Sequence, residues 1–150
     1  MNDEPVLASV AQRGVAFLID ALLALVVVGL PIAAATGQTY HTSTVSGFNL
    51  GGWSAAVFFA LVLGLLALSE WLFGTTPGKR LLGLRVIDAN GGPISARAAV
   101  TRNALRLLDA FPYVLPYVVG GIAAVSSDRN QRLGDRAGAT IVIQRAKGLT

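Results

Sequence analysis

The sequence lacks cysteine and has a single histidine, His41, and these scarcities exclude several kinds of site. Without cysteine the chain forms no disulfide, no thiol nucleophile and no cysteine-ligated metal centre. One histidine in a loop rich in serine and threonine cannot supply the three or four ligands that a zinc ion takes. The stretch PGKRLLG also lacks the spacing of a phosphate-binding loop. We therefore expect no metal, no cofactor and no enzymatic activity.

Charged residues are scarce too, at 13% of the 150 residues, against about 25% in soluble domains. Hydrophobic residues make up 53% of the chain, and the mean hydropathy is +0.61. The few charges are concentrated in short stretches, which leaves long neutral runs between them. This composition predicts an integral membrane protein, and the length predicts a single domain over residues 1–150.

Two apolar runs, 14–35 and 53–73, are each long enough to cross a bilayer, which requires roughly 20 apolar residues. Trp53 and Trp71 bracket the second run and would lie about 27 Å apart along a helix, as aromatic belts at two membrane surfaces do. We predict an all-α membrane protein with two transmembrane helices. The start of the chain is polar and acidic rather than basic, so we expect the first helix to be retained and not cleaved as a signal peptide.

The basic residues, which give a net charge of +4, predict the topology. They flank the apolar runs, so we expect anionic lipid headgroups on the cytoplasmic side, and not nucleic acid, as their partner. The loop 36–52 contains no lysine or arginine, and we place it outside the cell. The N-terminus and the loop 74–103 are then cytoplasmic, and the protein is a multi-pass protein of the cell membrane.

The segment 96–126 is expected to be an amphipathic helix that continues into an apolar stretch broken by Pro112 and Pro116. Ser95 is a suitable N-cap for its first part. Three outcomes are open for this segment: a third span, a re-entrant dip, or a bent helix pair along the inner interface. We favour a segment that does not cross, because the tail 127–150 is basic and a third crossing would place it outside.

Two short stretches, 82–88 and 139–145, have the composition of strands. If the third apolar segment does not cross the membrane, both stretches lie on the cytoplasmic side. Pairing them removes an exposed strand edge at each place. We therefore predict a small cytoplasmic two-stranded β element.

Charged residues inside or beside the apolar helices are the candidate functional residues. Asp20 lies two turns inside the first span, where a carboxylate costs on the order of 2.5–3.5 kcal/mol. Arg13 shares a helix face with it but lies about 10 Å away along the axis, so we expect each to meet a partner on another segment. Arg106 and Asp109 can pair at a spacing of three residues. Glu70 either extends to the inner interface, the interpretation we favour, or joins Asp20.

Small residues recur on both predicted spans at helical spacing, which indicates close helix contact. We predict that one stripe packs on the other, and the residues are Ala16 and Ala24 in the first span and Ala56, Ala60, Gly64 and Ala67 in the second.

Four motifs occur in order over about residues 10–145: AQRGVAFLID, TTPGKRLLGLRVID, RNALRLLD and QRLGDRAGAT. On these motifs the chain resembles the RDD family of small bacterial membrane proteins, named for one arginine and two aspartates. The resemblance places them at Arg13, Asp20 and Asp109, with Asp135 as the alternative to Asp109. It also marks a tail that usually reads GDRxAGT, here GDRAGAT with Gly138 and Ala139 exchanged, whose matched residues are Arg132, Gly134, Asp135 and Thr140.

The resemblance implies a fold rather than an activity, because the functions of this family are largely unassigned. One hypothesis is an accessory or assembly subunit of a membrane complex, held by a structural network of Arg13, Asp20, Asp109 and Arg106. The alternative is an oligomeric transporter component, since cation–proton exchange has been suggested for some members. In that case Asp20, Asp109 and Glu70 would carry the ion. Both hypotheses expect a second copy of the chain or other membrane subunits as partners.

Overall fold

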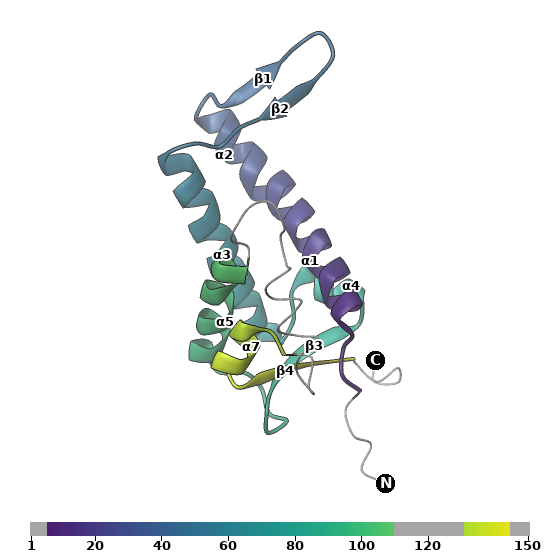
Figure 1. Cartoon of the computed structure of the whole chain (residues 1–150). Coiled ribbons are helices and arrows are strands. Elements are labelled where there is room, and N and C mark those ends of the chain that lie inside the picture. The colour runs from purple at the N-terminus through teal and green to yellow at the C-terminus, as the bar shows by residue number, and fades with distance from the viewer. Residues whose placement is uncertain (1–5, 110–130, 145–150) are drawn as a thin grey trace.

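A computed structural model describes residues 6–109 and 131–144, with side chains of the last helix before the gap described as far as Arg106 (Figure 1). The described chain is mostly helical and contains two small antiparallel sheets. Two long helices run side by side, with one sheet at each end of the pair (Figure 1). Both helices are long and apolar enough to cross a membrane, as predicted.

The first long helix consists of α1 (Val10–Ala24), the π-helical turn η1 (Leu25–Gly29) and α2 (Leu30–Ala35). Ser9 caps it, because its hydroxyl accepts from the backbone N–H of Gln12 at 3.1 Å while the Gln12 side chain accepts from the N–H of Ser9. The π turn has a local cause. Pro31 lacks an N–H and its ring would collide with the carbonyl of residue 27 in a regular helix, so a wider turn relieves the collision.

The second long helix, α3, covers Trp53–Phe73, the same range that the sequence predicts. It ends at Gly74, whose φ of 66° is the left-handed conformation that commonly closes a helix. Trp53 and Trp71 are both exposed near its two ends, as expected of residues at membrane interfaces.

A hairpin of β1 (Thr39–His41) and β2 (Ser46–Phe48) joins the two long helices and forms the upper end of the molecule in Figure 1. The sequence predicts only a polar loop here, because strands of three residues are too short to show an alternating pattern. His41, the single histidine, lies in this hairpin, and its Nδ1 is 3.0 Å from the hydroxyl of Ser46 on the opposite strand.

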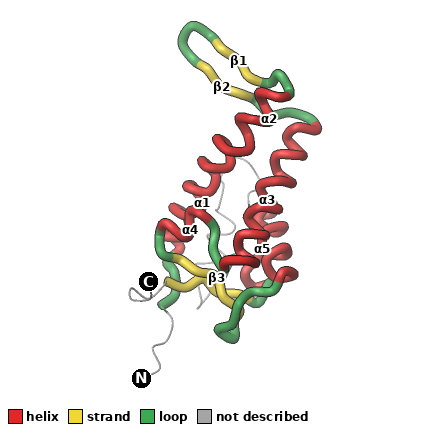
Figure 2. Tube along the Cα trace, turned by 180° about the vertical axis from the view of Figure 1, so that it is seen from behind, coloured by secondary structure: helices red, strands yellow, loops and turns green. Residues whose placement is uncertain are grey.

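The other end of the molecule is formed by α4 (Pro77–Leu81), β3 (Leu84–Asp88), α5 (Ala96–Asp109), α7 (Leu133–Ala137) and β4 (Thr140–Gln144). The predicted strand pairing is confirmed: β3 and β4 are antiparallel, with Leu84 opposite Gln144 and Asp88 opposite Thr140. Figure 2 shows this sheet below the long helices, with α5 alongside α3. Residues 110–126, on which the question of a third span depends, lie outside the described residues.

The buried apolar core lies at the sheet end of the molecule and is small. It joins α1, the β3–β4 sheet and the start of α5, through Ala8, Ala16, Leu84, Val86, Ile94, Ala99 and Val142. Elsewhere the long helices expose large apolar side chains such as Leu22, Val26 and Leu65. Exposed apolar faces on two helices of this length are what a lipid environment requires.

The predicted packing of the small-residue stripe of α3 on the first helix is wrong for most of the stripe. Ala56, Ala60 and Gly64 are exposed, and Ala67 alone of the four is buried. The reason is that α3 packs mainly on α5, while Ala16 is covered by α4 and the buried core. The first helix contacts α3 chiefly through η1 and α2.

Candidate functional site

A cluster of buried charged side chains lies where the two long helices end beside the β3–β4 sheet. Each member is no more than 7% exposed, and together they come from α1, α3, α4, α5 and the start of α7: Arg13, Asp20, Glu70, Lys79, Arg102, Arg132 and Asp135. Burying so many charges is tolerable only if each is paired and hydrogen-bonded. We call this set the charge cluster.

Glu70 is the centre of one half of the charge cluster and is completely buried in the last turn of α3. Its carboxylate accepts from Lys79 on α4, from Nε of Arg102 at 2.9 Å and from Nδ2 of Asn103 at 2.9 Å. The guanidinium of Arg106 lies 4.0 Å away. One carboxylate thus holds α3, α4 and α5 together.

Asp135 is the centre of the other half. Its carboxylate accepts from Arg13 of α1, from Nη1 of Arg102 at 3.1 Å and from the backbone N–H of Arg132 at 3.0 Å. Arg102 therefore bridges Asp135 and Glu70, and its Nη1 also donates to the Thr140 hydroxyl at 2.6 Å. A planar guanidinium with several fixed donors is suited to such a bridge.

Asp20 is held in a different way, by neutral donors. Its two oxygens accept from the Thr76 hydroxyl at 2.6 Å and from the backbone N–H of Gly78 at 2.7 Å. The start of α4 reaches Asp20 because Gly78 has no side chain: a Cβ there would lie 2.1 Å from the carbonyl oxygen of Ala16. The positive end of the α4 backbone thus faces a carboxylate that lies inside the first long helix.

Burial and the neighbouring charges together shift the pKa values of the cluster members that lie outside the long helices. Burial alone would raise the pKa of Asp135, but Arg102, Arg13 and the N–H of Arg132 lower it to about 2. Burial opposes the charged form of Arg102, yet the attraction of Glu70 and Asp135 outweighs it and raises its pKa. Burial lowers the pKa of Lys79 to about 7, against the opposing attraction of Glu70.

The cluster encloses a cavity of about 20 Å³, room for a single water molecule. Its wall includes Phe17, whose ring centroid lies 5.9 Å from the guanidinium of Arg106. Within residues 6–109 and 131–144, no group of three acidic or histidine side chains is placed to hold a metal ion. The arrangement is thus suited to holding helices in place, since every carboxylate of the cluster has at least two donors.

The predictions for Arg13 and Asp20 are confirmed in that each meets a partner on another segment. The interpretation favoured for Glu70 is wrong, because this residue is buried among cations and does not extend to the interface. Those cations are Lys79 of α4 and Arg102 of α5, which the packing of these helices brings to the end of α3. Arg106 lies at the edge of the cluster, 4.0 Å from Glu70, and its predicted pairing with Asp109 lies outside the described residues.

Asp135, the alternative to Asp109 as the second aspartate of the family motif, belongs to the charge cluster. Asp135 is the carboxylate that meets Arg13, 122 residues away along the chain. The side chain of Asp109 lies outside the described residues. The other tail residues singled out, Arg132, Gly134 and Thr140, are all buried at the same place, where a Cβ on Gly134 would lie 2.8 Å from the carbonyl oxygen of Arg102.

Sequence reasoning missed four members or supports of the site: Thr76, Lys79, Arg102 and Asn103. The basic residues around Lys79 predict only a cytoplasmic loop, and the pattern around Arg102 predicts only an amphipathic helix. The positions of these two residues inside the motifs TTPGKRLLGLRVID and RNALRLLD were the available signal, because both motifs also characterise the resemblance. Periodicity could not single them out, because a charged residue on a short helix is usually solvated.

Comparison with known families gives a match over most of the chain. The model of the RDD family matches residues 7–139, which include Arg13, Asp20, Glu70, Arg102 and Asp135. Neither the curated proteins nor the solved structures contain a match to this chain. The family match covers most of the sequence, and the two long apolar helices agree with a membrane protein. The chain therefore belongs to the RDD family.

Proposed function

We propose that this protein is an accessory or assembly subunit of a membrane complex, and that its charge cluster is a structural lock. The observation that supports this most directly is the complete pairing of the carboxylates. Asp20, Glu70 and Asp135 each accept at least two hydrogen bonds or ion pairs, and these contacts join α1, α3, α4, α5 and α7. Their function is then to hold the two long helices in one arrangement.

The competing function is ion transport, in which Asp20, Glu70 and Asp109 would bind and release cations or protons. A carrier carboxylate has to present oxygen atoms to the ion. Asp20 and Glu70 instead direct theirs at Thr76, Gly78 and the cations of α4 and α5. This pairing is our reason for preferring the structural role.

The expected setting is the cell membrane, with two crossings and the hairpin on the outer side. The loop 36–52 has no lysine or arginine, whereas the sheet end carries exposed Arg80, Arg85 and Arg97, which the positive-inside rule places in the cytoplasm. The partners are other membrane chains or further copies of this one. Exposed Ala56, Ala60 and Gly64 on α3 would let a neighbouring helix approach closely.

The test compares protein level with function in the same membranes. Arg13→Ala removes the α1 contact of Asp135 and leaves a buried carboxylate with one cation fewer, a loss of about 3–5 kcal/mol for a buried pair. We expect the amount of folded protein in membranes, and its co-purification with partners in mild detergent, to fall together. Arg97→Ala is the matched control, because Arg97 is exposed on α5.

Asp20→Asn distinguishes the two functions. In proteoliposomes a transporter would lose ion flux while its amount stayed normal. If Asp20→Asn is present at the normal level and abolishes a measurable cation or proton flux, the structural role is wrong and the transport role is supported.

A further inference from the structure

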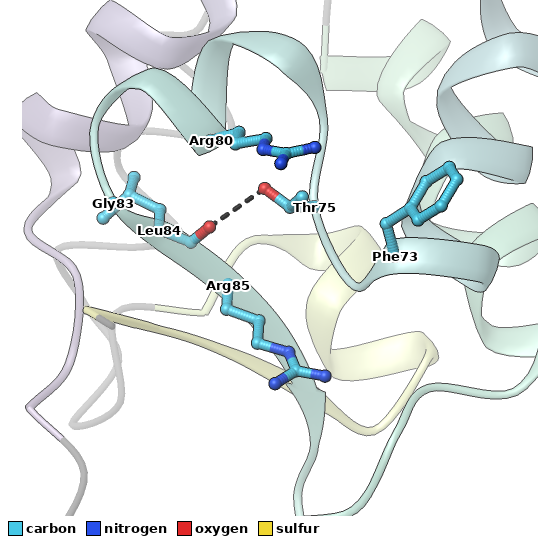
Figure 3. A pocket seen from close by; sticks show the side chains of 6 residues that line it. All are labelled: Phe73, Thr75, Arg80, Gly83, Leu84 and Arg85. Atoms are coloured by element: carbon cyan, nitrogen blue, oxygen red, sulfur yellow. Dashed lines mark hydrogen bonds between the residues drawn. The ribbon is translucent and has the colours of Figure 1, made fainter. Parts of the chain in front are cut away.

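A second, separate cavity opens at the junction of α3, α4 and β3 and has a volume of about 190 Å³ (Figure 3). It is lined by Phe73, Thr75, Arg80, Gly83, Leu84 and Arg85. Unlike the charge cluster, its cations are exposed. Neither Arg80 nor Arg85 forms an ion pair with a carboxylate in the described part of the chain. The cavity therefore presents two cations without a described counter-ion.

The cavity wall is fixed by backbone contacts. The Thr75 hydroxyl donates to the carbonyl of Leu84 at 3.0 Å, and the N–H of Val86 donates to the carbonyl of Gly74 at 2.6 Å. Arg85 lies against Gly74, where a Cβ would come within 3.1 Å of Nε. These contacts tie the end of α3 to β3, so the two arginines extend from a rigid frame.

Figure 3 shows the side chains of Arg80 and Arg85 on either side of the Thr75 hydroxyl, with the Phe73 ring to one side. Arg80 comes from α4 and Arg85 from β3. Both arginines line the same cavity, and two guanidinium groups in one cavity can donate to separate oxygens of one tetrahedral anion. Phosphate is such an anion and arginine is its usual partner.

The cavity lies at the end of a candidate membrane span, and this position indicates the source of the phosphate. Phe73 lines the cavity and ends α3, the second candidate span. It is exposed, as are Trp71 and Leu72 before it in the chain and Leu81 at the end of α4, which is 72% exposed. Aromatic and large apolar side chains exposed at the end of a span lie at the headgroup level of the bilayer. A phosphate at that level belongs to a lipid whose acyl chains can contact the same apolar side chains.

We propose that this cavity binds the phosphate of an anionic glycerophospholipid, with Arg80 and Arg85 as its two ligands. The two arginines would favour anionic lipids over zwitterionic ones. Phosphatidylglycerol has a net negative charge, whereas the positive choline of phosphatidylcholine neutralises the phosphate of the same lipid. This site is independent of the charge cluster, so it can be tested whether or not the assembly role is correct.

The experiment measures the thermal midpoint of the purified full chain in mild detergent while one additive is titrated. The additives are short-chain phosphatidylglycerol, short-chain phosphatidylcholine and inorganic phosphate. We expect phosphatidylglycerol to raise the midpoint and the other two to leave it nearly unchanged. Each of Arg80→Gln and Arg85→Gln should weaken the apparent affinity about fivefold, and the double variant should lose the shift.

Arg97→Gln is the matched control, since it removes one exposed arginine elsewhere and should keep the full response. Native mass spectrometry of the same samples counts bound phosphatidylglycerol directly, so a variant with altered stability remains informative. An equal shift with phosphatidylcholine, or a double variant that retains the lipid, would overturn the proposal. A full shift with inorganic phosphate alone would assign the site to free phosphate and overturn the lipid source.

Discussion

Ala139 has a φ of 49°, the left-handed conformation that favours glycine, and is the only non-glycine residue with positive φ among the described residues. The preceding Gly138 has a φ of −88°, which any residue adopts. This pair is the one at which the chain departs from the usual RDD tail, with the glycine one position early. The backbone therefore retains the conformation that suits a glycine at 139, although alanine occupies the position.

We predict that Ala139→Gly increases the free energy of unfolding by about 1 kcal/mol, because it removes the contact of Cβ with the backbone in this conformation. Denaturant titration in detergent micelles measures the change. Gly138→Ala is the companion variant and should give no such gain, since its Cβ would lie 3.2 Å from the carbonyl oxygen of Gly134. A stabilising Gly138→Ala with a neutral Ala139→Gly would contradict this account.

The pKa of Asp135 predicts how the free energy of unfolding depends on pH. Its pKa is lowered from 3.8 to about 2 in the folded protein, so the unfolded chain binds the proton more tightly. The stabilisation, about 2 kcal/mol, is fully present above about pH 4 and is lost as the pH falls to about 2. Unfolding titrations between pH 2 and 5 should show this loss, and the carboxyl carbon shift of Asp135 should titrate near pH 2. A titration midpoint near 4 would show that the ion pairs do not act on this group.

At the scale of elements, short pieces decide how the long helices are held. The five-residue α4 begins against α1, and its second residue, Gly78, donates to Asp20. Likewise α7 lies against α5, with Gly134 beside the backbone of Arg102. In both places a glycine lets two backbones approach, and a charged or polar group then completes the contact.

We predict that Gly78→Ala destabilises the protein by about 3 kcal/mol or more, because a Cβ placed 2.1 Å from the Ala16 carbonyl oxygen would force α4 away from α1. Asp20 would then lose the N–H of Gly78. Thermal unfolding of the purified variant, with the yield of folded protein, measures the effect. Gly92→Ala is the control, since a Cβ there meets no atom within 4 Å; equal losses in both variants would refute the close packing of α4.

At the scale of the whole molecule, the hairpin and the β3–β4 sheet lie at opposite ends of the two long helices (Figures 1 and 2). If both helices cross the bilayer, those ends face different compartments. Because the chain has no cysteine, a single introduced cysteine reports its own position without background.

We predict that a membrane-impermeant thiol reagent labels Ser43→Cys from outside intact cells and labels Ala96→Cys only after the membrane is opened. Both positions are exposed, the first in the hairpin and the second at the start of α5. The unmodified chain is the control and should take up no label. Labelling of both variants from the same side would show that one of the helices does not cross.

The sequence by itself determined the elements whose causes are local. The range of α3 follows from an apolar run, the pairing of β3 with β4 from two strand-like stretches, and the α5 N-cap from Ser95, whose hydroxyl accepts from the backbone N–H of Ala98 at 3.1 Å. Asp20 was recognisable as an anomaly because a carboxylate inside an apolar run is costly wherever the chain folds.

Only the tertiary structure decided which charges meet. Arg13 pairs with Asp135, Glu70 is enclosed by Lys79 and Arg102, and Asp20 is held by hydroxyl and backbone donors. These contacts join residues up to 122 positions apart, and they depend on how α4, α5 and α7 pack against the long helices. Helical periodicity reports the face on which a residue lies, but the partner of that face is set by packing between elements.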